Sequence, residues 1–125
     1  MHLIDTNILI YHFNGNIPDE SVTTINKIFK KNFNISVITQ MEFLGFRKHT
    51  KESFKKAKQF LEYCNVVDLD DEIVNLVIDI RRNYNIKLPD AIIAATAIFN
   101  DYNLVTRNIK DFEKLRIRIY NPFDI

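Results

Sequence analysis

Short apolar runs alternate along the chain with longer segments whose apolar residues have helical spacing, and this alternation constrains the fold most. Strands are predicted over residues 2–5, 35–38, 66–69, 103–106 and 116–120. Helices are predicted over residues 6–13, 19–31, 39–48, 51–63, 70–81 and 89–99, with a short helical turn at 110–114. Because strands that alternate with helices pair in parallel, the pattern predicts an α/β fold with three layers, α/β/α, around a central parallel sheet of four to five strands.

The segment 89–99 is the most apolar of the predicted helices. Pro89 suits the first turn of a helix, and the alanines and isoleucines that follow surround the helix axis. A helix that is apolar on nearly all sides is buried. A chain of 125 residues with 46% hydrophobic content can form one core, and we find no linker, repeat or low-complexity stretch. The sequence therefore predicts a single domain over residues 1–125.

The charge balance gives little attraction for nucleic acid over the whole surface. Seventeen Lys and Arg oppose sixteen Asp and Glu, for a formal net charge of +1, so any nucleic-acid binding must be local. The first residues lack the basic start and apolar stretch of a signal peptide, and no apolar run reaches the roughly 18 residues of a membrane span. We therefore expect a cytoplasmic protein with no membrane partner.

The scarce residue types exclude several kinds of chemistry. Gly15 and Gly45 are the only glycines, so no Gly-rich phosphate loop or dinucleotide fingerprint can form. Cys64 is the single cysteine; it cannot form an internal disulfide, and with three scattered His residues it gives no zinc-ligand spacing. We predict that Cys64 is a small buried hydrophobic residue on a core helix without a His partner. Covalent catalysis therefore has no candidate nucleophile.

Four acidic residues lie where predicted strands end or where the next helix begins. Asp5 closes the first strand, Glu42 lies just inside the helix after the second, Asp90 opens the apolar helix, and Asp111 follows the fourth strand. Ligands of open parallel sheets bind beyond the carboxyl ends of the strands. We therefore expect these four side chains to lie close together in space.

Each acid also has a structural alternative. Asp5 can cap the helix that follows it, Asp90 can interact with the dipole of its helix, and Asp111 can be an ordinary solvated residue. Glu42 projects onto the same helix face as Ile38 and its apolar neighbours, where an unpaired carboxylate would be costly to bury. We therefore expect a cation near Glu42, either a metal ion or a Lys or Arg in a salt bridge.

Convergence of the four acids would favour a metal site. Crowded carboxylates repel one another and are normally tolerated when a divalent cation neutralises them. A site with oxygen ligands only is typical of Mg²⁺ or Mn²⁺. Such ions polarise phosphoryl oxygens and generate hydroxide, so phosphodiester hydrolysis is the expected reaction class.

Four segments resemble the motifs of PIN-domain proteins. Residues 3–10, which read Leu-Ile-Asp-Thr-Asn-Ile-Leu-Ile, and residues 35–45, Ile-Ser-Val-Ile-Thr-Gln-Met-Glu-Phe-Leu-Gly, are similar to the opening motifs. Residues 88–97, Leu-Pro-Asp-Ala-Ile-Ile-Ala-Ala-Thr-Ala, and residues 104–112, with Leu-Val-Thr-Arg-Asn and Asp-Phe, look like the remaining two motifs of the VapC-like toxins. The four occur in the family's order and span essentially the whole chain.

The resemblance implies a Mg²⁺- or Mn²⁺-dependent endoribonuclease that cuts RNA involved in translation, such as tRNA, rRNA or mRNA. Asp5, Glu42 and Asp90 match the family's acidic ligands, and Asp111 matches its more variable fourth acid. Four further polar residues are implied to support the pocket: Thr6, Asn7, Thr106 and Asn108. Asn108 stands where some members carry an acid, so whether Asn108 or Asp111 completes the site stays open.

The resemblance also implies partners. Proteins of this kind are the toxin half of a type II toxin-antitoxin pair and form homodimers. A cognate antitoxin is implied to lay its C-terminal segment across the active-site groove, often presenting an Arg to the acids. We therefore expect an RNA substrate, an antitoxin and a second copy of the chain as partners.

Two other functions are compatible with an α/β chain of this length. A phosphoacceptor receiver-like signalling domain also gathers acids around magnesium, but it has adjacent acids after its first strand, whereas this chain has Asp5, Thr6 and Asn7. A non-catalytic PIN-fold module that only binds RNA or protein would have lost acid positions, whereas Asp5, Glu42 and Asp90 are intact.

A run of basic residues could hold RNA phosphates beside the acids. The run consists of Arg47, Lys48, Lys51, Lys55, Lys56 and Lys58. Phosphate contacts of this kind add salt-dependent affinity without reading sequence. The alternative is an ordinary solvated helix face, because the apolar residues of the same segment pack on the other side.

Overall fold

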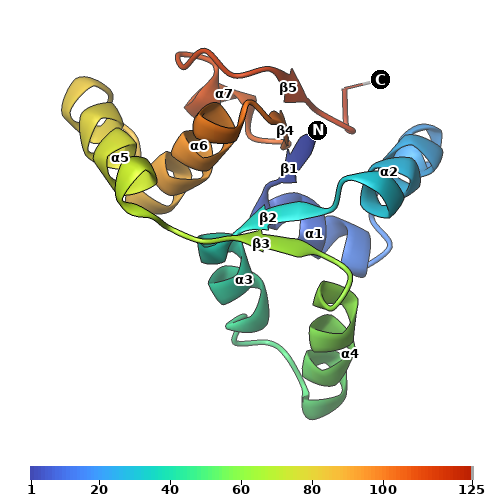
Figure 1. The fold of residues 1–125 in the computed structure, drawn as a ribbon. Coiled ribbons are helices and arrows are strands. Elements are labelled where there is room, and N and C mark those ends of the chain that lie inside the picture. Colours follow the sequence, from blue (N-terminus) through green and yellow to red (C-terminus); the bar gives the residue numbers. More distant parts are fainter. Residues whose placement is uncertain (125) are drawn as a thin grey trace.

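A computed structural model describes residues 1–124, in which five strands form one sheet (Figure 1). The strands are β1 (His2–Ile4), β2 (Asn34–Ser36), β3 (Asn65–Val67), β4 (Asn103–Val105) and β5 (Ile119–Tyr120). Their order is β3-β2-β1-β4-β5, and every neighbouring pair is parallel. The parallel sheet of the sequence prediction is confirmed. A receiver domain has the order 2-1-3-4-5, so the observed order excludes that fold.

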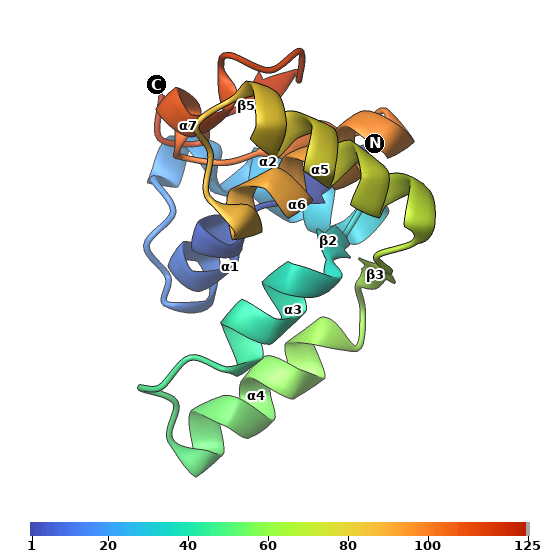
Figure 2. The same ribbon diagram turned by 90° about the vertical axis from the view of Figure 1, so that its left-hand side faces the viewer.

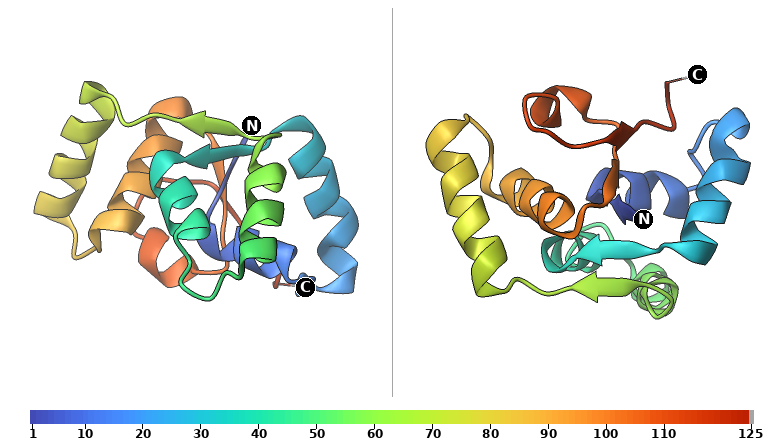
Figure 3. Two further views of the ribbon diagram at one scale, coloured as in Figure 1. Left: turned by 90° about the horizontal axis from the view of Figure 1, so that it is seen from below. Right: turned by 45° about the horizontal axis from the view of Figure 1, so that its top comes forward.

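Helices cover both faces of the sheet, which confirms the three-layer α/β/α prediction (Figure 3). They are α1 (Thr6–Phe13), α2 (Asp19–Lys31), α3 (Val37–Leu44), α4 (Lys51–Leu61), α5 (Asp71–Asn83), α6 (Leu88–Asn100) and α7 (Ile109–Phe112). Buried residues of α5, α6 and α7 form one core, and those of α1, α2, α3 and α4 contribute to the other. No helix among residues 1–124 is long and apolar enough to cross a membrane.

The two central strands supply both cores through the alternation of their side chains. Leu3 and Leu104 point into the core of α5, α6 and α7, whereas Ile4 and Val105 point into the opposite core. All four side chains are fully buried. Strand side chains alternate between faces, so each strand residue is assigned to one layer. The register pairs Leu3 with Leu104 and Ile4 with Val105. The residues that follow the two strands, Asp5 and Thr106, are therefore neighbours.

The second strand ends earlier than its β-branched sequence predicts. We expected a strand over 35–38 and a helix over 39–48, but β2 ends at Ser36 and α3 begins at Val37. The cause is a helix cap, because the Ser36 hydroxyl accepts a hydrogen bond from the Ile38 amide at 3.2 Å. The helix then ends at Leu44, and the amide of the capping Gly45 donates to the Met41 carbonyl. A Cβ at Gly45 would come within 2.6 Å of that oxygen, so glycine fits this close approach.

Helices α3 and α4 form the predicted helical hairpin, which Figure 2 shows extending from the rest of the fold. His49 joins its two arms. One ring nitrogen lies 2.9 Å from the Phe43 carbonyl oxygen at the end of α3, and the other lies 2.9 Å from the Ser53 hydroxyl in α4. Cys64 follows α4 rather than lying on it, and it is half-buried, so its predicted place on a core helix is wrong.

Substitutions in α6 test whether its close packing beside the sheet depends on alanine. Ala94 is fully buried, so Ala94→Leu adds three carbons where the core has no space and should lower the free energy of unfolding by about 1–3 kcal/mol. Phe99→Leu, on the exposed side of the same helix, should change it by less than about 0.5 kcal/mol. Urea unfolding of both variants measures the difference. Equal effects would show that α6 is not tightly packed.

Candidate functional site

Asp5 is the most buried of the four acids. It follows β1 directly and caps α1, because its Oδ1 accepts a hydrogen bond from the Thr6 amide at 2.8 Å. Its Oδ2 accepts hydrogen bonds from the Thr106 hydroxyl at 2.7 Å and the Asn7 side-chain amide at 3.2 Å. Only 4% of the residue is exposed. The predicted capping role is therefore present, and the cap faces the end of the neighbouring strand.

Thr106 and Asn108 link Asp5 to Asp111. Thr106 follows β4 as Asp5 follows β1, and its buried hydroxyl also accepts a hydrogen bond from the Asn108 amide at 2.9 Å. The Asn108 side-chain amide donates to Asp111 Oδ2. Asp111 is exposed, as the solvated alternative predicted, but this hydrogen bond orients it. Asn108 and Asp111 thus lie together, with the amide holding the acid.

Glu42 lies on α3 and is exposed, so its predicted burial on an apolar helix face is wrong. The helix begins two residues earlier than expected and ends at Leu44, which leaves Glu42 in its last turn. The Thr6 hydroxyl donates to Glu42 Oε1 at 2.7 Å. No Lys or Arg among residues 1–124 forms a salt bridge with Glu42. The predicted salt-bridge alternative is therefore also wrong.

Thr39 is a site residue that the sequence analysis missed. It is fully buried on α3, and its hydroxyl lies 3.0 Å from the Thr6 hydroxyl that holds Glu42. A usable signal was present in the sequence, because Thr39 precedes Glu42 by three residues and residues three apart share a helix face. Three polar side chains from α1 and α3 therefore form one chain of contacts.

Asp90 brings α6 into this group. It lies in the first turn of α6 after Pro89, as predicted, and it is half-buried. Burial raises the pKa of Asp90, and the negative charges of Asp111 and Glu42 raise it further, whereas Lys87 acts in the opposite direction. Two acids from other elements are thus near enough to Asp90 to disfavour its ionised form.

The pKa of Asp5 is raised from 3.8 to about 6. Burial is the largest cause, and the negative charges of Asp90 and Glu42 add to it, although the hydrogen bonds from Thr106 and Thr6 oppose the rise. None of the four acids forms a salt bridge within residues 1–124. The four acids therefore repel one another, and Lys87 opposes this repulsion at Asp90 without forming a salt bridge.

The donor atoms at this place suit a hard cation. Among the described residues, no three His, Cys, Asp or Glu side chains are grouped closely enough to hold an ion as they stand. Mg²⁺, however, keeps several waters and needs only one or two carboxylates. Asn7 Oδ1 is buried beside Asp5 and has no hydrogen-bond partner within residues 1–124. Carboxylates and this amide oxygen are the ligand types that Mg²⁺ and Mn²⁺ accept.

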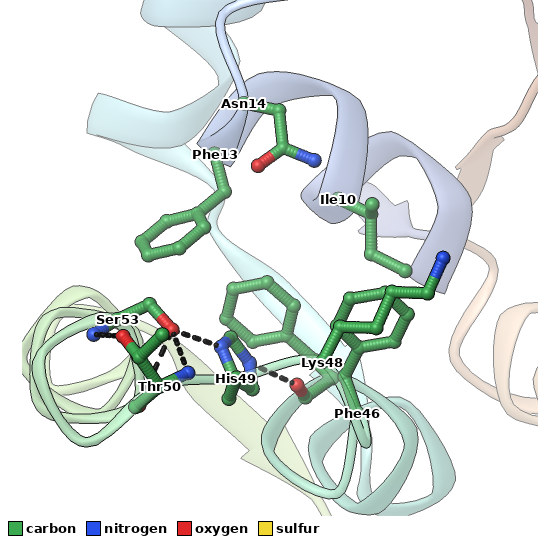
Figure 4. A pocket seen from close by; sticks show the side chains of 9 residues that line it. Ile10, Phe13, Asn14, Phe46, Lys48, His49, Thr50 and Ser53 are labelled. Atoms are coloured by element: carbon green, nitrogen blue, oxygen red, sulfur yellow. Dashed lines mark hydrogen bonds between the residues drawn. The ribbon is translucent and has the colours of Figure 1, made fainter.

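A separate cavity of about 260 Å³ lies between the end of α1 and the α3–α4 hairpin (Figure 4). Its lining consists of Ile10, Phe13, Asn14, Phe43, Phe46, Lys48, His49, Thr50 and Ser53. Figure 4 shows the hydrogen bonds that tie His49, Thr50 and Ser53 together at its base. None of the four acids lines it, so this cavity is distinct from the acidic group.

The raised pKa of Asp5 predicts a pH-dependent cost of keeping it ionised in the metal-free fold. The pKa of Asp5 is higher in the folded than in the unfolded protein. Its protonated carboxyl therefore stabilises the fold fully below pH 4, and this stabilisation is lost as the pH rises through about 6. The free energy of unfolding of the wild type, relative to Asp5→Asn, should fall by about 2 kcal/mol between pH 4 and 7. Urea titrations of both proteins in EDTA measure this difference.

The comparison with Asp5→Asn subtracts the contribution of groups that titrate alike in both proteins. Asp79→Asn removes an exposed carboxylate from α5 and is the matched control. Its difference from the wild type gives the baseline for removing an exposed carboxylate. A difference for Asp5→Asn that varies with pH no more than this baseline would show that the carboxyl is not destabilised by burial.

Comparisons with known proteins agree with this geometry. The chain matches the PIN domain family over residues 2–117. It is 32% identical over 128 residues to "Ribonuclease VapC1" of Methanocaldococcus jannaschii, covering 95% of this chain and 86% of that protein. Among solved structures it is similar to a toxin-antitoxin complex from Klebsiella pneumoniae (TM-score 0.81, 32% identity, all of both chains). DNA-bound VapBC from Salmonella typhimurium is also similar (TM-score 0.83, 25% identity, 97% of each chain). The chain therefore belongs to the PIN-domain family, as a VapC-like member.

Proposed function

We propose that this protein is a metal-dependent endoribonuclease that hydrolyses RNA phosphodiester bonds at the group formed by Asp5, Glu42, Asp90 and Asp111. The observation that carries the proposal is a hydrogen-bonded group: Thr6, Thr106 and Asn108 connect Asp5, Glu42 and Asp111. The negative charges of Glu42 and Asp111 also act on Asp90, and none of the four acids forms a salt bridge among residues 1–124. The name of the M. jannaschii relative, "Ribonuclease VapC1", supports the same activity.

Asp5 and Asp90 are the proposed principal ligands of Mg²⁺ or Mn²⁺, with Glu42 and Asp111 binding the ion or its waters. When bound, the ion would supply polarisation of the phosphoryl oxygen and a water of lowered pKa. Its positive charge would favour the ionised forms of Asp5 and Asp90, whose pKa values are raised without it. The repulsion between the acids destabilises the metal-free fold. A bound cation would relieve it, and this relief would contribute to the affinity for the cation.

The remaining polar residues keep the acids in place. Thr106 and Asn7 donate to the same oxygen of Asp5 and fix the orientation of its carboxylate. Thr6 holds one oxygen of Glu42, which leaves the other oxygen free among the described residues to accept a proton from an attacking water. Asn108 holds Asp111, so we propose Asp111 as the fourth acid and Asn108 as its positioning residue.

We also propose that the chain is the toxin of a toxin-antitoxin pair and forms a homodimer. The similar solved structures are described as a toxin-antitoxin complex and as VapBC, which supports a cognate antitoxin for this chain. An antitoxin that presents an Arg to the four acids would neutralise their repulsion as a metal ion does. RNA involved in translation (tRNA, rRNA or mRNA) is the proposed substrate class.

Removal of Asp90 should abolish cleavage without unfolding the protein. Asp90→Asn eliminates a half-buried charge that its neighbours repel, so the metal-free variant should be at least as stable as the wild type. Purified wild type, Asp90→Asn and the control Asp79→Asn are incubated with a tRNA and rRNA pool in Mn²⁺, Mg²⁺ or EDTA. Metal-dependent cutting by the wild type and Asp79→Asn, and none by Asp90→Asn, is the expected result.

Thermal melts with added Mn²⁺ separate metal binding from cleavage. The ion should raise the melting temperature of the wild type by mass action and raise that of Asp90→Asn less. Binding of the ion without cleavage of any RNA would favour the non-catalytic PIN-fold module. Cutting that survives EDTA or Asp90→Asn would contradict the assigned site.

A further inference from the structure

Arg107 is an exposed cation at the same edge of the sheet as the four acids. It lies between Thr106, which donates to Asp5, and Asn108, which donates to Asp111. Both acids thus have a hydrogen-bond donor next to Arg107 in the chain. Within residues 1–124, however, Arg107 forms no salt bridge. The guanidinium of Arg107 is held instead by contacts with other residues.

Two aromatic rings hold Arg107. Its guanidinium carbon lies 4.3 Å from the ring centre of Phe123 and 5.3 Å from that of Tyr11, and these rings lie 4.8 Å apart. One terminal nitrogen donates to the Tyr11 hydroxyl at 3.0 Å. Contacts of a guanidinium with aromatic faces are attractive and leave its N–H edge free. Arg107 is therefore held through its faces and one donor.

The support beneath Arg107 is itself anchored. The Ser21 hydroxyl of α2 donates to the Pro122 carbonyl, and the Asn121 side chain accepts a hydrogen bond from the Phe123 amide at 2.9 Å. Tyr11 is six residues after Asp5 on α1, or about 9 Å along the helix axis. The hydroxyl that holds Arg107 thus belongs to the helix that Asp5 caps, and the other donors of Arg107 have no partner among the described residues.

From this arrangement we propose that Arg107 is a preorganised binding residue for an RNA backbone phosphate flanking the bond that is cut. A guanidinium binds phosphate oxygens with its planar fork, and one that is already ordered loses little entropy on binding. The inference rests on the proposed function, because it places the substrate at the four acids. It assigns phosphate contact to the aromatic-held Arg107 rather than to the flexible lysines of α4, where Lys56 already pairs with Glu52 at 3.3 Å.

The test measures RNA binding rather than cleavage. The parent protein carries Asp90→Asn so that RNA is bound but not cut. Its binding to a fluorescent single-stranded RNA is measured by anisotropy between about 50 and 200 mM salt at constant Mg²⁺, which gives the dissociation constant. Adding Arg107→Gln should weaken binding about tenfold at the lower salt concentration and reduce the slope of log affinity against log salt by about 0.7, the value of one single-strand phosphate contact.

Two further Arg variants make the result specific. Arg107→Lys keeps the charge and should restore the slope, but it should restore only part of the affinity because it loses the planar stacking on Phe123. Arg118→Gln removes the same charge at the other end of β4, where Arg118 contacts Asn103 and Asp101. It should bind RNA like the parent.

Tyr11→Phe removes only the hydroxyl contact and should weaken binding less than Arg107→Gln, and it tests the proposal even if Arg107→Gln fails to fold. A slope for Arg107→Gln equal to that of Arg118→Gln would overturn the proposal, as would a lowered melting temperature with unchanged RNA binding. Polyglutamate serves as a probe for an acidic protein partner. If Arg107→Gln lost binding to polyglutamate but kept its binding to RNA, Arg107 would be assigned to a protein partner and the proposal would be overturned. Failure of the parent to bind RNA at any salt concentration would contradict the proposed function itself.

Discussion

Pairing of β1 with β4 brings the residues after the two strands together, and both the cores and the acidic site depend on this. The same register that sends Leu3 and Leu104 into one core, and Ile4 and Val105 into the other, places Asp5 beside Thr106. Parallel strands make this possible because their carboxyl ends lie at one edge of the sheet. The helices that follow then bring Glu42 and Asp90 to that edge from α3 and α6.

Electrostatics at this edge opposes folding and favours binding. Burial and the surrounding negative charges raise the pKa of Asp5 to about 6, and the pKa of Asp90 is raised for the same reasons. Proteins generally place such repulsion where a ligand relieves it. A divalent cation, or an Arg from a partner, would do so here. Arg107 does not relieve it within residues 1–124, because aromatic contacts and the Tyr11 hydroxyl hold its guanidinium instead.

Much of the fold could be predicted from local patterns. The range of α1 agrees with the prediction and that of α2 agrees to within a residue, because a turn cluster separates two segments of helical spacing. Asp19, expected as the cap of α2, is its first residue, and Pro18 is the cap. The start of α3 was missed because Val37 and Ile38 suit a strand, and only the Ser36 cap shows that the helix has begun. Local propensity is overridden in such cases by a single hydrogen bond to the backbone.

The four acids are candidates because of their positions in the chain, but their surroundings could not be predicted. Exposure of Glu42 depends on how α3 packs against α1 and α6, which no local pattern encodes. The contact between Thr39 and Thr6 joins residues 33 positions apart, and that between Thr106 and Asp5 joins residues 101 apart. Strand order was equally hidden, because alternation of strands and helices predicts parallel pairing without specifying which strands are neighbours.

The position of a bound cation tests the assignment of the four acids as a metal site. Crystals of the protein soaked in Mn²⁺ can be measured at a wavelength where manganese scatters anomalously, so that the ion is located independently of any assumption about its ligands. We predict an anomalous peak in contact with Asp5 and Asp90 that is absent from crystals of Asp5→Asn. A peak elsewhere with an empty acidic group, or one unchanged in the variant, would contradict the assignment of the site.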